Sequence, residues 1–348
     1  MKKNSLRSFL SLSGLLAASL PAFATGINFT CAANIDTTHA GTCATLNGTF
    51  AGFYSSTFTN ANAGIYISYG TTGLGSSIQY YTNTAYSAYA NALNNSISGA
   101  NDVTAVASLG GLTTNPVDGT KGVALTGALR AALGLGTGLG IDLADAVCTL
   151  GTANCYNGRI TLTSAANTFS YLTVGQTAST YDFFEVTGHE VNEILGTSSC
   201  ITTTAGNPAT SGNCTNGSPA VGVGAPDLFR YSAAGTRSYL GSANGTVAYF
   251  SINSGNTNIA GYNNTPNGAD YGDWDSSSVR LNNAFGTPGH QGFNITNDGG
   301  SEIKVLDAVG YNLVANQAGA VPEPGTITLF GSAFAVLAGV AHRRRRRS

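Results

Sequence analysis

Short stretches of alternating apolar and polar residues run along much of the chain, and apolar residues at helical spacing interrupt them in several places. Alternation of branched or aromatic residues with small polar ones predicts strands at 65–69, 76–81, 159–163 and 248–252. Helical spacing or helix-start signals predict helices at 85–97, 102–109, 123–133, 180–196 and 301–309. This mixture predicts an α+β fold with a loop-rich C-terminal half.

The helix predicted over residues 180–196 has the clearest signals. Asp182, with Glu185 three residues later, is typical of a helix start. Phe184, Val191 and Leu195 share one face of that helix, and Gly196 stands where a helix commonly ends. We therefore expect a central helix with one buried face.

Both ends of the chain have the features of export signals. Basic residues near the N-terminus precede an apolar stretch from Leu10 to Leu20 and the small-residue pattern Ala22-Phe23-Ala24. Charge, a short apolar core and a small-residue site are the parts of a secretory signal peptide. We expect residues 1–24 to be removed by signal peptidase.

The C-terminus carries Pro322-Glu323-Pro324, then an apolar segment over 326–341 and five arginines, Arg343 to Arg347. These three parts, in residues 320–348, resemble the PEP-CTERM sorting signal of Gram-negative bacteria. The resemblance implies transient anchoring in the inner membrane through 326–341, processing by an exosortase, and a final place at the cell surface or outside the cell. A plain C-terminal membrane anchor is the alternative, because the arginines suit the cytoplasmic side.

Charge is distributed unevenly between the ends and the middle of the chain. Of the 15 Lys and Arg residues, eight lie in the two terminal segments, whereas only one of the 17 Asp and Glu residues does. The part between them, 25–319, thus has a net charge of −9, and its length suits one large domain. An acidic protein is a poor partner for nucleic acid, since phosphate binding needs a basic surface.

The six cysteines fall into three close pairs, Cys31 with Cys43, Cys148 with Cys155, and Cys200 with Cys214. Each pair flanks a loop-like stretch, and an oxidising compartment preserves disulfides. We therefore predict three local disulfide bonds. A four-cysteine zinc site is the alternative, although no Cys-x-x-Cys spacing occurs.

Metal-binding chemistry is indicated on the central helix, at His189-Glu190-Val191-Asn192-Glu193. Residues four apart lie on one helix face, so His189 and Glu193 can hold one cation. Glu190 is rotated by about 100° and can reach a water as a general base. The alternative is a solvated helix on which these charges have no common role.

The third ligand has to come from elsewhere. Metzincin zinc endopeptidases would place it at the position of Ser199, and serine is a poor zinc ligand. No methionine follows Met1, so a literal Met-turn is absent from the sequence. Asp227 and His290 are the downstream candidates.

Several segments together resemble a family of predicted secreted metalloproteases that often carry a PEP-CTERM tail. The segments are Tyr181 to Phe184, His189 to Gly196, Asp227 to Ser232, Tyr249 to Ile252, Gly272 to Trp274 and Leu306 to Tyr311. The resemblance covers roughly residues 85–311, and the helix motif of that family is also His-Glu-x-x-Glu.

That resemblance implies a single zincin-like catalytic domain over 25–319. It favours Asp227 over His290 as the third ligand, and it implies that Arg230 and Tyr231 stand near the metal, where Tyr231 would help to stabilise an oxyanion. A turn or cap role after Pro226 is the alternative for Asp227.

A second metal is a further possibility at Asp270, Asp273 and Asp275, whose spacing suits Ca²⁺ with nearby carbonyl oxygens. Such a cluster more often caps turns. One histidine with two carboxylates makes an oxygen-rich set, which binds Zn²⁺ but also suits harder ions.

The sequence thus predicts a secreted or surface-sorted zinc-dependent endopeptidase that hydrolyses protein or peptide substrates with a metal-activated water. Glu190 would be its general base. The alternative is a non-catalytic surface or extracellular-matrix protein, with or without a structural metal. The low charge and the many Asn, Thr and Gly residues suit that alternative.

Overall fold

The computed structural model describes residues 26–201, 214, 223–239, 247–265, 267–292 and 300–315. The predicted signal peptide (1–24) and the predicted sorting segment (320–348, with its apolar stretch 326–341) lie outside these ranges. No helix within the described ranges has the length and apolar character needed to cross a bilayer.

Helices and strands are mixed along the chain, which confirms the predicted α+β class. The first part contains β1 (Ile27–Cys31), α1 (Ala33–Thr38), α2 (Thr42–Thr45), α3 (Ala51–Thr57), β2 (Ala63–Gly70), β3 (Gly75–Gln79), β4 (Tyr81–Ala85), α4 (Tyr86–Asn95) and α5 (Ala100–Ser108). The middle contains β5 (Gly122–Thr126), α6 (Gly127–Ala132), β6 (Leu139–Ile141), β7 (Val147–Thr149), β8 (Gly158–Thr163), β9 (Phe169–Ser170), β10 (Tyr181–Asp182) and α7 (Phe183–Asn192). The last part contains β11 (Arg230–Ala233), β12 (Thr236–Arg237), β13 (Tyr249–Phe250), β14 (Ala260–Gly261) and α8 (Ser301–Val309).

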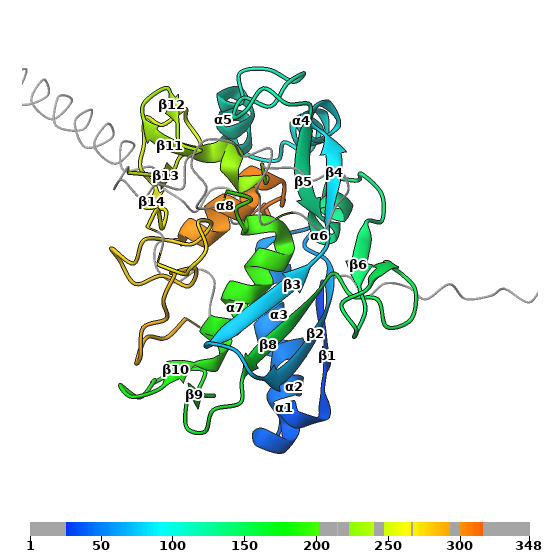
Figure 1. Cartoon of the computed structure of the whole chain (residues 1–348), viewed down its shortest axis with the longest axis vertical. Helices are drawn as coiled ribbons and strands as arrows, with labels where there is room; N and C mark the ends of the chain where they lie inside the picture. The colour runs from blue at the N-terminus through cyan, green and yellow to red at the C-terminus, as the bar shows by residue number, and fades with distance from the viewer. Residues whose placement is uncertain are drawn as a thin grey trace, which may run out of the picture.

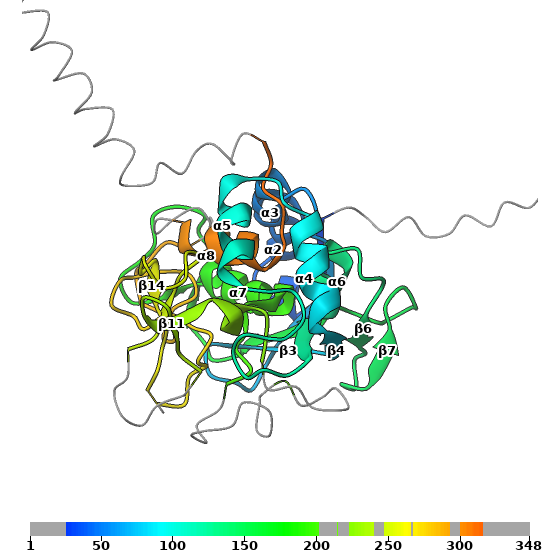
Figure 2. The same cartoon turned by 90° about the horizontal axis from the view of Figure 1, so that it is seen from above.

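The main sheet has the strand order β1-β2-β8-β3. Strands β1, β2 and β8 are parallel, whereas β3 is antiparallel to β8, with Ser77 opposite Ile160. Among the described residues, β3 pairs only with β8, so it is an edge strand. Figure 1 shows β3 and β8 crossing in front of α7, and α7 contacts both strands. Figure 2 shows α7 at the centre, with the other large helices to one side of it.

One predicted element is wrong in type. The apolar run 123–133, expected to be one helix, is the strand β5 followed by the short helix α6. Val123 and Leu125 are fully buried, and β5 pairs antiparallel with β4. The Thr126 hydroxyl then accepts a hydrogen bond from the Leu129 amide and caps α6. A short apolar run buried on both faces does not distinguish strand from helix by periodicity.

The central helix forms where the sequence predicts it. Asp182 caps it, since its Oδ1 accepts a hydrogen bond from the Phe184 amide at 2.8 Å. After Asn192 the chain continues through a π-helical turn, Glu193–Thr197, and Gly196 adopts a φ of 109°. A residue with a Cβ rarely adopts that conformation, so glycine is the residue suited to end the helix here.

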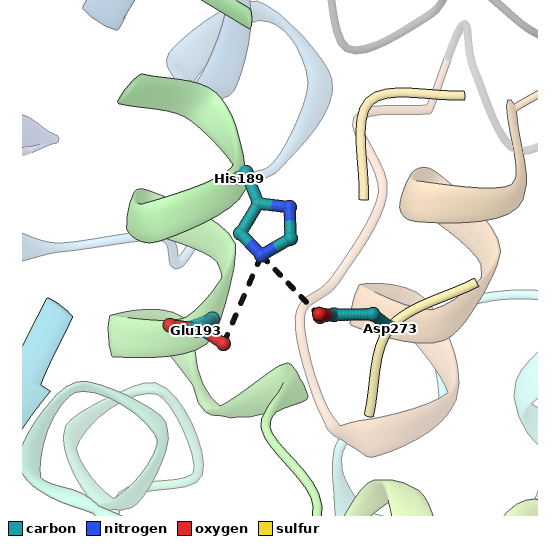
Figure 3. Close-up of side chains that lie close together, drawn as sticks. All are labelled: His189, Glu193 and Asp273. Atoms are coloured by element: carbon teal, nitrogen blue, oxygen red, sulfur yellow. Dashed lines mark ion pairs between the residues drawn. The ribbon is translucent and has the colours of Figure 1, made fainter. Parts of the chain in front are cut away.

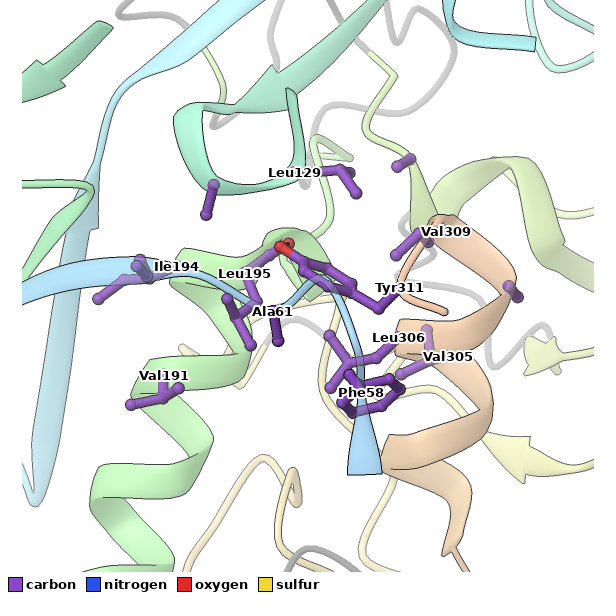
Figure 4. Packing of buried hydrophobic residues seen from close by; sticks show 14 of the residues in the cluster. Phe58, Ala61, Leu129, Val191, Ile194, Leu195, Val305, Leu306, Val309 and Tyr311 are labelled. Carbon is purple, nitrogen blue, oxygen red and sulfur yellow. Dashed lines mark hydrogen bonds between the residues drawn. The ribbon is translucent and has the colours of Figure 1, made fainter. Parts of the chain in front are cut away.

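The buried face of α7 lies in the main hydrophobic core, where the π-helical turn that follows it contacts α8 (Figure 4). Val191 and Leu195 are fully buried there with Leu306, and Tyr311 donates a hydrogen bond to the Leu195 carbonyl at 2.8 Å. The core thus fixes one side of α7 and leaves the opposite side to face the edge strand β3.

The described part of the C-terminal half consists mostly of loops, as predicted, and side chains hold much of it together. Arg230 is fully buried: it donates hydrogen bonds to the Tyr271 carbonyl and to Asn264 Oδ1, and it lies 4.5 Å over the ring of Tyr262. Glu302 of α8 is also fully buried and accepts a hydrogen bond from Trp274 Nε1 at 2.8 Å. These two charged groups anchor the segment from Tyr271 to Trp274 on both sides.

Three disulfide bonds join the predicted close pairs, Cys31–Cys43, Cys148–Cys155 and Cys200–Cys214. No cysteine of the described residues remains free. The local pairing is therefore confirmed, and the alternative of a four-cysteine zinc site is wrong.

Candidate metal centre and cleft

His189, Glu193 and Asp273 come together on the side of α7 that faces away from the core (Figure 3). His189 Nε2 lies 3.3 Å from Asp273 Oδ1 and 3.9 Å from Glu193 Oε1. One ligand atom from each residue lies within 4.8 Å of the other two. Helical spacing unites His189 with Glu193, as predicted, and the loop after Tyr271 supplies the third group.

The separations fit a small divalent ion. Ligand atoms at about 2.0–2.1 Å from a tetrahedral zinc are about 3.3–3.4 Å apart. The distance between His189 and Asp273 matches that spacing, and the distance between His189 and Glu193 exceeds it by about half an ångström. One imidazole nitrogen and two carboxylate oxygens are also a donor set that zinc accepts.

Ser77 of the edge strand orients one of these carboxylates. Its hydroxyl donates a hydrogen bond to Glu193 Oε2 at 2.5 Å, which leaves Oε1 to face His189. Hydrogen bonds of this kind fix the orientation of metal ligands and tune their basicity. Strand β3 therefore contributes to the geometry of the centre without providing a ligand.

The carboxylates of this region are crowded. Burial, reinforced by the charge of Glu193, raises the pKa of Glu190 well above its ordinary value. Burial and the same neighbour raise the pKa of Asp270 to about 7. Burial alone would lower the pKa of His189, but Asp273 and the two glutamates outweigh it and hold that pKa well above its usual value. The cluster has more carboxyl groups than the single histidine can balance as charges, and a divalent cation would favour their ionised forms.

A cleft of about 570 Å³ opens onto these groups. Its lining includes His189, Glu190, Glu193 and Asp273, together with residues 73–77 around the edge strand and residues 281 and 283–286 of the loop opposite. Glu190 approaches the strand closely, because a Cβ on Gly75 would lie 2.5 Å from Glu190 Oε1. The centre is therefore buried among protein atoms on one side and accessible from the cleft on the other.

The predicted third ligand, Asp227, does not join this group. It is buried, and its carboxylate accepts hydrogen bonds from the Ser199 hydroxyl and from the amides of Cys200 and Gly224, at 2.9 and 2.8 Å. Both oxygens are thus occupied in holding two loop segments together, which is the turn role that the sequence left open. Asp273 occupies the place expected for Asp227.

The other predicted residues also lie elsewhere. Tyr231 is buried and does not line the cleft, and the guanidinium of Arg237 lies 4.8 Å from the centre of the Tyr231 ring. Arg230 is committed to the loop contacts described above. His290 contacts Glu185, with Nδ1 2.7 Å from Oε2, and is not a member of the ligand group.

The three aspartates expected to bind calcium do not converge on one point. Asp273 faces His189, and Asp270 forms a hydrogen bond with Glu193. Asp275 accepts a hydrogen bond from the Ser277 amide at 2.9 Å and so closes a turn. The sequence therefore pointed to the acidic segment that supplies Asp273. It grouped Asp273 with the neighbouring aspartates, whereas in the structure Asp273 lies with His189 and Glu193.

Comparison of the chain with protein families, with characterised proteins and with solved structures gave no match. The resemblance to secreted metalloproteases and the zincin-like assignment therefore stay predictions from the motifs.

Proposed function

We propose that this protein is a zinc-dependent endopeptidase. The observation that carries the proposal is the convergence of His189, Glu193 and Asp273 in a cleft, with Glu190 beside them and outside the ligand group. Three protein ligands leave a position open, as in catalytic zinc sites, whereas structural zinc sites are closed by four.

Zinc bound here would polarise the scissile carbonyl and acidify a water molecule. Glu190 is the base that takes a proton from the attacking water and then delivers it to the leaving amine. Burial raises the pKa of Glu190, which favours the protonated form that delivers a proton to the leaving amine. Ser77 holds Glu193 in place during the reaction.

The edge strand supports a peptide as the substrate. Strand β3 borders the cleft and has an unpaired side among the described residues. An extended peptide can add to such an edge through main-chain hydrogen bonds. A peptide bound in this way passes over Glu190, which lies against Gly75 of the same strand.

Export is consistent with this activity. The three disulfides persist in an oxidising compartment outside the cytoplasm, which supports secretion or sorting to the cell surface. Protein or peptide outside the inner membrane is thus the proposed substrate, and the signal peptidase and the exosortase are the proposed partners during export.

The test is zinc content by mass spectrometry on the purified protein, compared among variants. Glu193→Gln and Asp273→Asn each remove one ligand charge and are expected to abolish stoichiometric zinc binding. Asp275→Asn is the matched control, since Asp275 is on the same segment but closes a turn. Asp227→Asn tests whether Asp227, the ligand predicted from the sequence, or Asp273 completes the site. We expect this variant to retain zinc.

Activity is tested with Glu190→Gln in a screen of quenched peptide substrates. We expect this variant to keep its zinc and to lose about 10²- to 10⁴-fold in kcat. Wild-type protein that binds no zinc, even after zinc is added, would rule out the enzyme and leave a non-catalytic surface protein.

A structural metal site is the second candidate, and Asp270 is the observation that favours it. Asp270 lines the cleft and forms a hydrogen bond with Glu193, so it is placed to become a fourth ligand. Asp270→Asn would then weaken zinc binding as strongly as Asp273→Asn does. Retained zinc and retained peptidase activity in Asp270→Asn would support the open catalytic site.

A further inference from the structure

The cleft is largely apolar at the end where α7 begins, although Glu185 also lines it there. Leu74, Tyr181, Val186 and Phe285 all line it. A Cβ placed on Gly286 would lie 2.9 Å from Leu74 Cδ1 and 3.2 Å from Tyr181 Cδ1, so the two side chains meet beside Gly286. Val186 lies one helical turn before Glu190 and, like Glu190, lies against Gly75.

The opposite end of the cleft is polar. Glu193, one turn after His189, forms hydrogen bonds there with Ser77 and Asp270. His189 and Glu190 thus lie between an apolar surface and an acidic one. A peptide running along β3 places the side chains on the two sides of the scissile bond in these two different environments.

Phe285 stands out at the apolar end because it is 54% exposed while the segment around it is fixed. Before it, the Ala284 amide donates a hydrogen bond to the Trp274 carbonyl at 3.0 Å. After it, the Gly289 amide donates to the Thr180 carbonyl at 2.9 Å, and His290 contacts Glu185. The backbone is anchored on both sides, so Phe285 is held at the mouth of the cleft by its surroundings.

Exposed aromatic rings beside a buried polar centre are typical of ligand sites, where apolar walls surround a few placed polar groups. Covering an exposed phenyl ring with a second apolar group is favourable because apolar surface leaves water. The stabilisation is somewhat larger when the second group is also aromatic. Leu74 and Val186 complete a surface of that kind around Phe285.

We propose, on the basis of the peptidase function above, that the substrate has a large apolar side chain next to the scissile bond. That side chain rests against Phe285, Leu74 and Val186 at the end of the cleft where α7 begins. Phe285 is then a specificity-determining residue that takes no part in the chemistry.

Short blocked peptides that carry a hydroxamate, which chelates the zinc and is not cleaved, are suitable probes. Two series place the hydroxamate before or after a residue Xaa, so that Xaa is offered to either side of the metal, and Xaa is Phe, Leu or Ser. Calorimetry on the zinc-loaded protein gives each Kd. In one series we expect Phe and Leu to bind about tenfold more tightly than Ser.

Phe285→Ser is expected to remove that preference and to leave the Ser peptide unchanged. Val174→Ser is the matched control, since Val174 is 76% exposed and does not line the cleft. Equal binding of Phe and Ser peptides in both series, or a preference that survives in Phe285→Ser, would overturn the inference alone. Failure of every hydroxamate to bind wild-type protein would overturn the peptidase function and, with it, this inference.

Discussion

Two regions meet at the candidate metal centre, and they are held in different ways. The framework region, residues 26–197, supplies His189, Glu190 and Glu193 from a helix that packs on a sheet and on the core. The loop region, residues 223–239, 247–265 and 267–292, supplies Asp270, Asp273 and Phe285 from segments with few strand or helix hydrogen bonds. Backbone hydrogen bonds of the helix and sheet position the framework residues, whereas a few buried side chains position the residues of the loop region.

The difference shows where the site is vulnerable. Each ladder of the framework region distributes its stability over many hydrogen bonds, so that no single side chain is decisive. In the loop region, Arg230 holds the Tyr271 carbonyl and Glu302 holds the indole of Trp274, on either side of Asp273. Loss of a buried charged group leaves its partners unsatisfied, which costs more free energy than the loss of a surface contact.

Arg230→Met is expected to have the largest effect. It removes three hydrogen bonds and the contact with Tyr262, and should lower the free energy of unfolding by about 3–5 kcal/mol. Denaturant unfolding checks the loss, and zinc titration checks whether Asp273 is displaced.

Arg159→Met is the matched control, because Arg159 pairs with the half-exposed Asp145 at the surface. Its cost should stay below about 1 kcal/mol. Equal losses in the two arginine variants would contradict the view that buried side chains hold the loop region.

Gly75→Ala tests the framework region at its contact with the cleft. The new Cβ would lie 2.5 Å from Glu190 Oε1 and 2.8 Å from Val186 Cγ1, so Glu190 has to move. We expect peptidase activity to fall about 10- to 100-fold, in line with an overpacking cost of about 1–3 kcal/mol, while zinc stays bound.

Gly73→Ala is its control, since Gly73 also lines the cleft but a Cβ there meets nothing within 4 Å. Zinc content and peptide hydrolysis are measured together on both variants. Unchanged activity in Gly75→Ala would argue against Glu190 as the base.

A dependence of stability on pH is expected from the contact of α8 with α5. Asp102 of α5 accepts hydrogen bonds from the amides of Ser98 and Gly99, at 2.7 and 2.9 Å. Burial, and then the charge of Asp102 and a hydrogen bond to it, raise the pKa of Asp307 in α8 to about 8. Asp307 is therefore protonated in the folded protein at neutral pH and donates to Asp102.

The sign follows from that raised pKa. The pKa of Asp307 is higher in the folded protein than in the unfolded chain, so its contribution to stability is fully present at low pH. That contribution is lost as pH rises from about 4 through 8. Tm should fall by about 10 °C or more over this range, and the Tm of Asp307→Asn, which keeps a donor, should fall less. If Tm of the Asp307→Asn variant depended on pH in the same way as Tm of the wild type, a proton between Asp307 and Asp102 would be refuted.

The limits of sequence-based prediction follow the same division between the two regions. His189, Glu190 and Glu193 could be identified because helical spacing alone places them together, and Asp182 and Gly196 marked where the helix begins and ends. Helix α8, Ser301–Val309, was also predicted at its observed bounds. These are local relations, which residue order determines.

Asp273 could not be chosen in this way, because 80 residues separate it from Glu193 and its position depends on Arg230 and Glu302. Asp227 has a carboxylate and a motif in its favour, but Ser199, Cys200 and Gly224 occupy that carboxylate. Only tertiary contacts distinguish a free carboxylate from one already satisfied. The helices α1 to α3 were missed because their small polar residues give little periodic signal.

The disulfide connectivity has a consequence for how the chain is made. Every described bond joins a cysteine to the next one along the sequence, with separations of 12, 7 and 14 residues. An oxidase that joins cysteines in the order in which they emerge would therefore produce the native set out of fifteen connectivities. A chain that is synthesised and threaded from its N-terminus can complete each bond before the next pair arrives, with no later reshuffling.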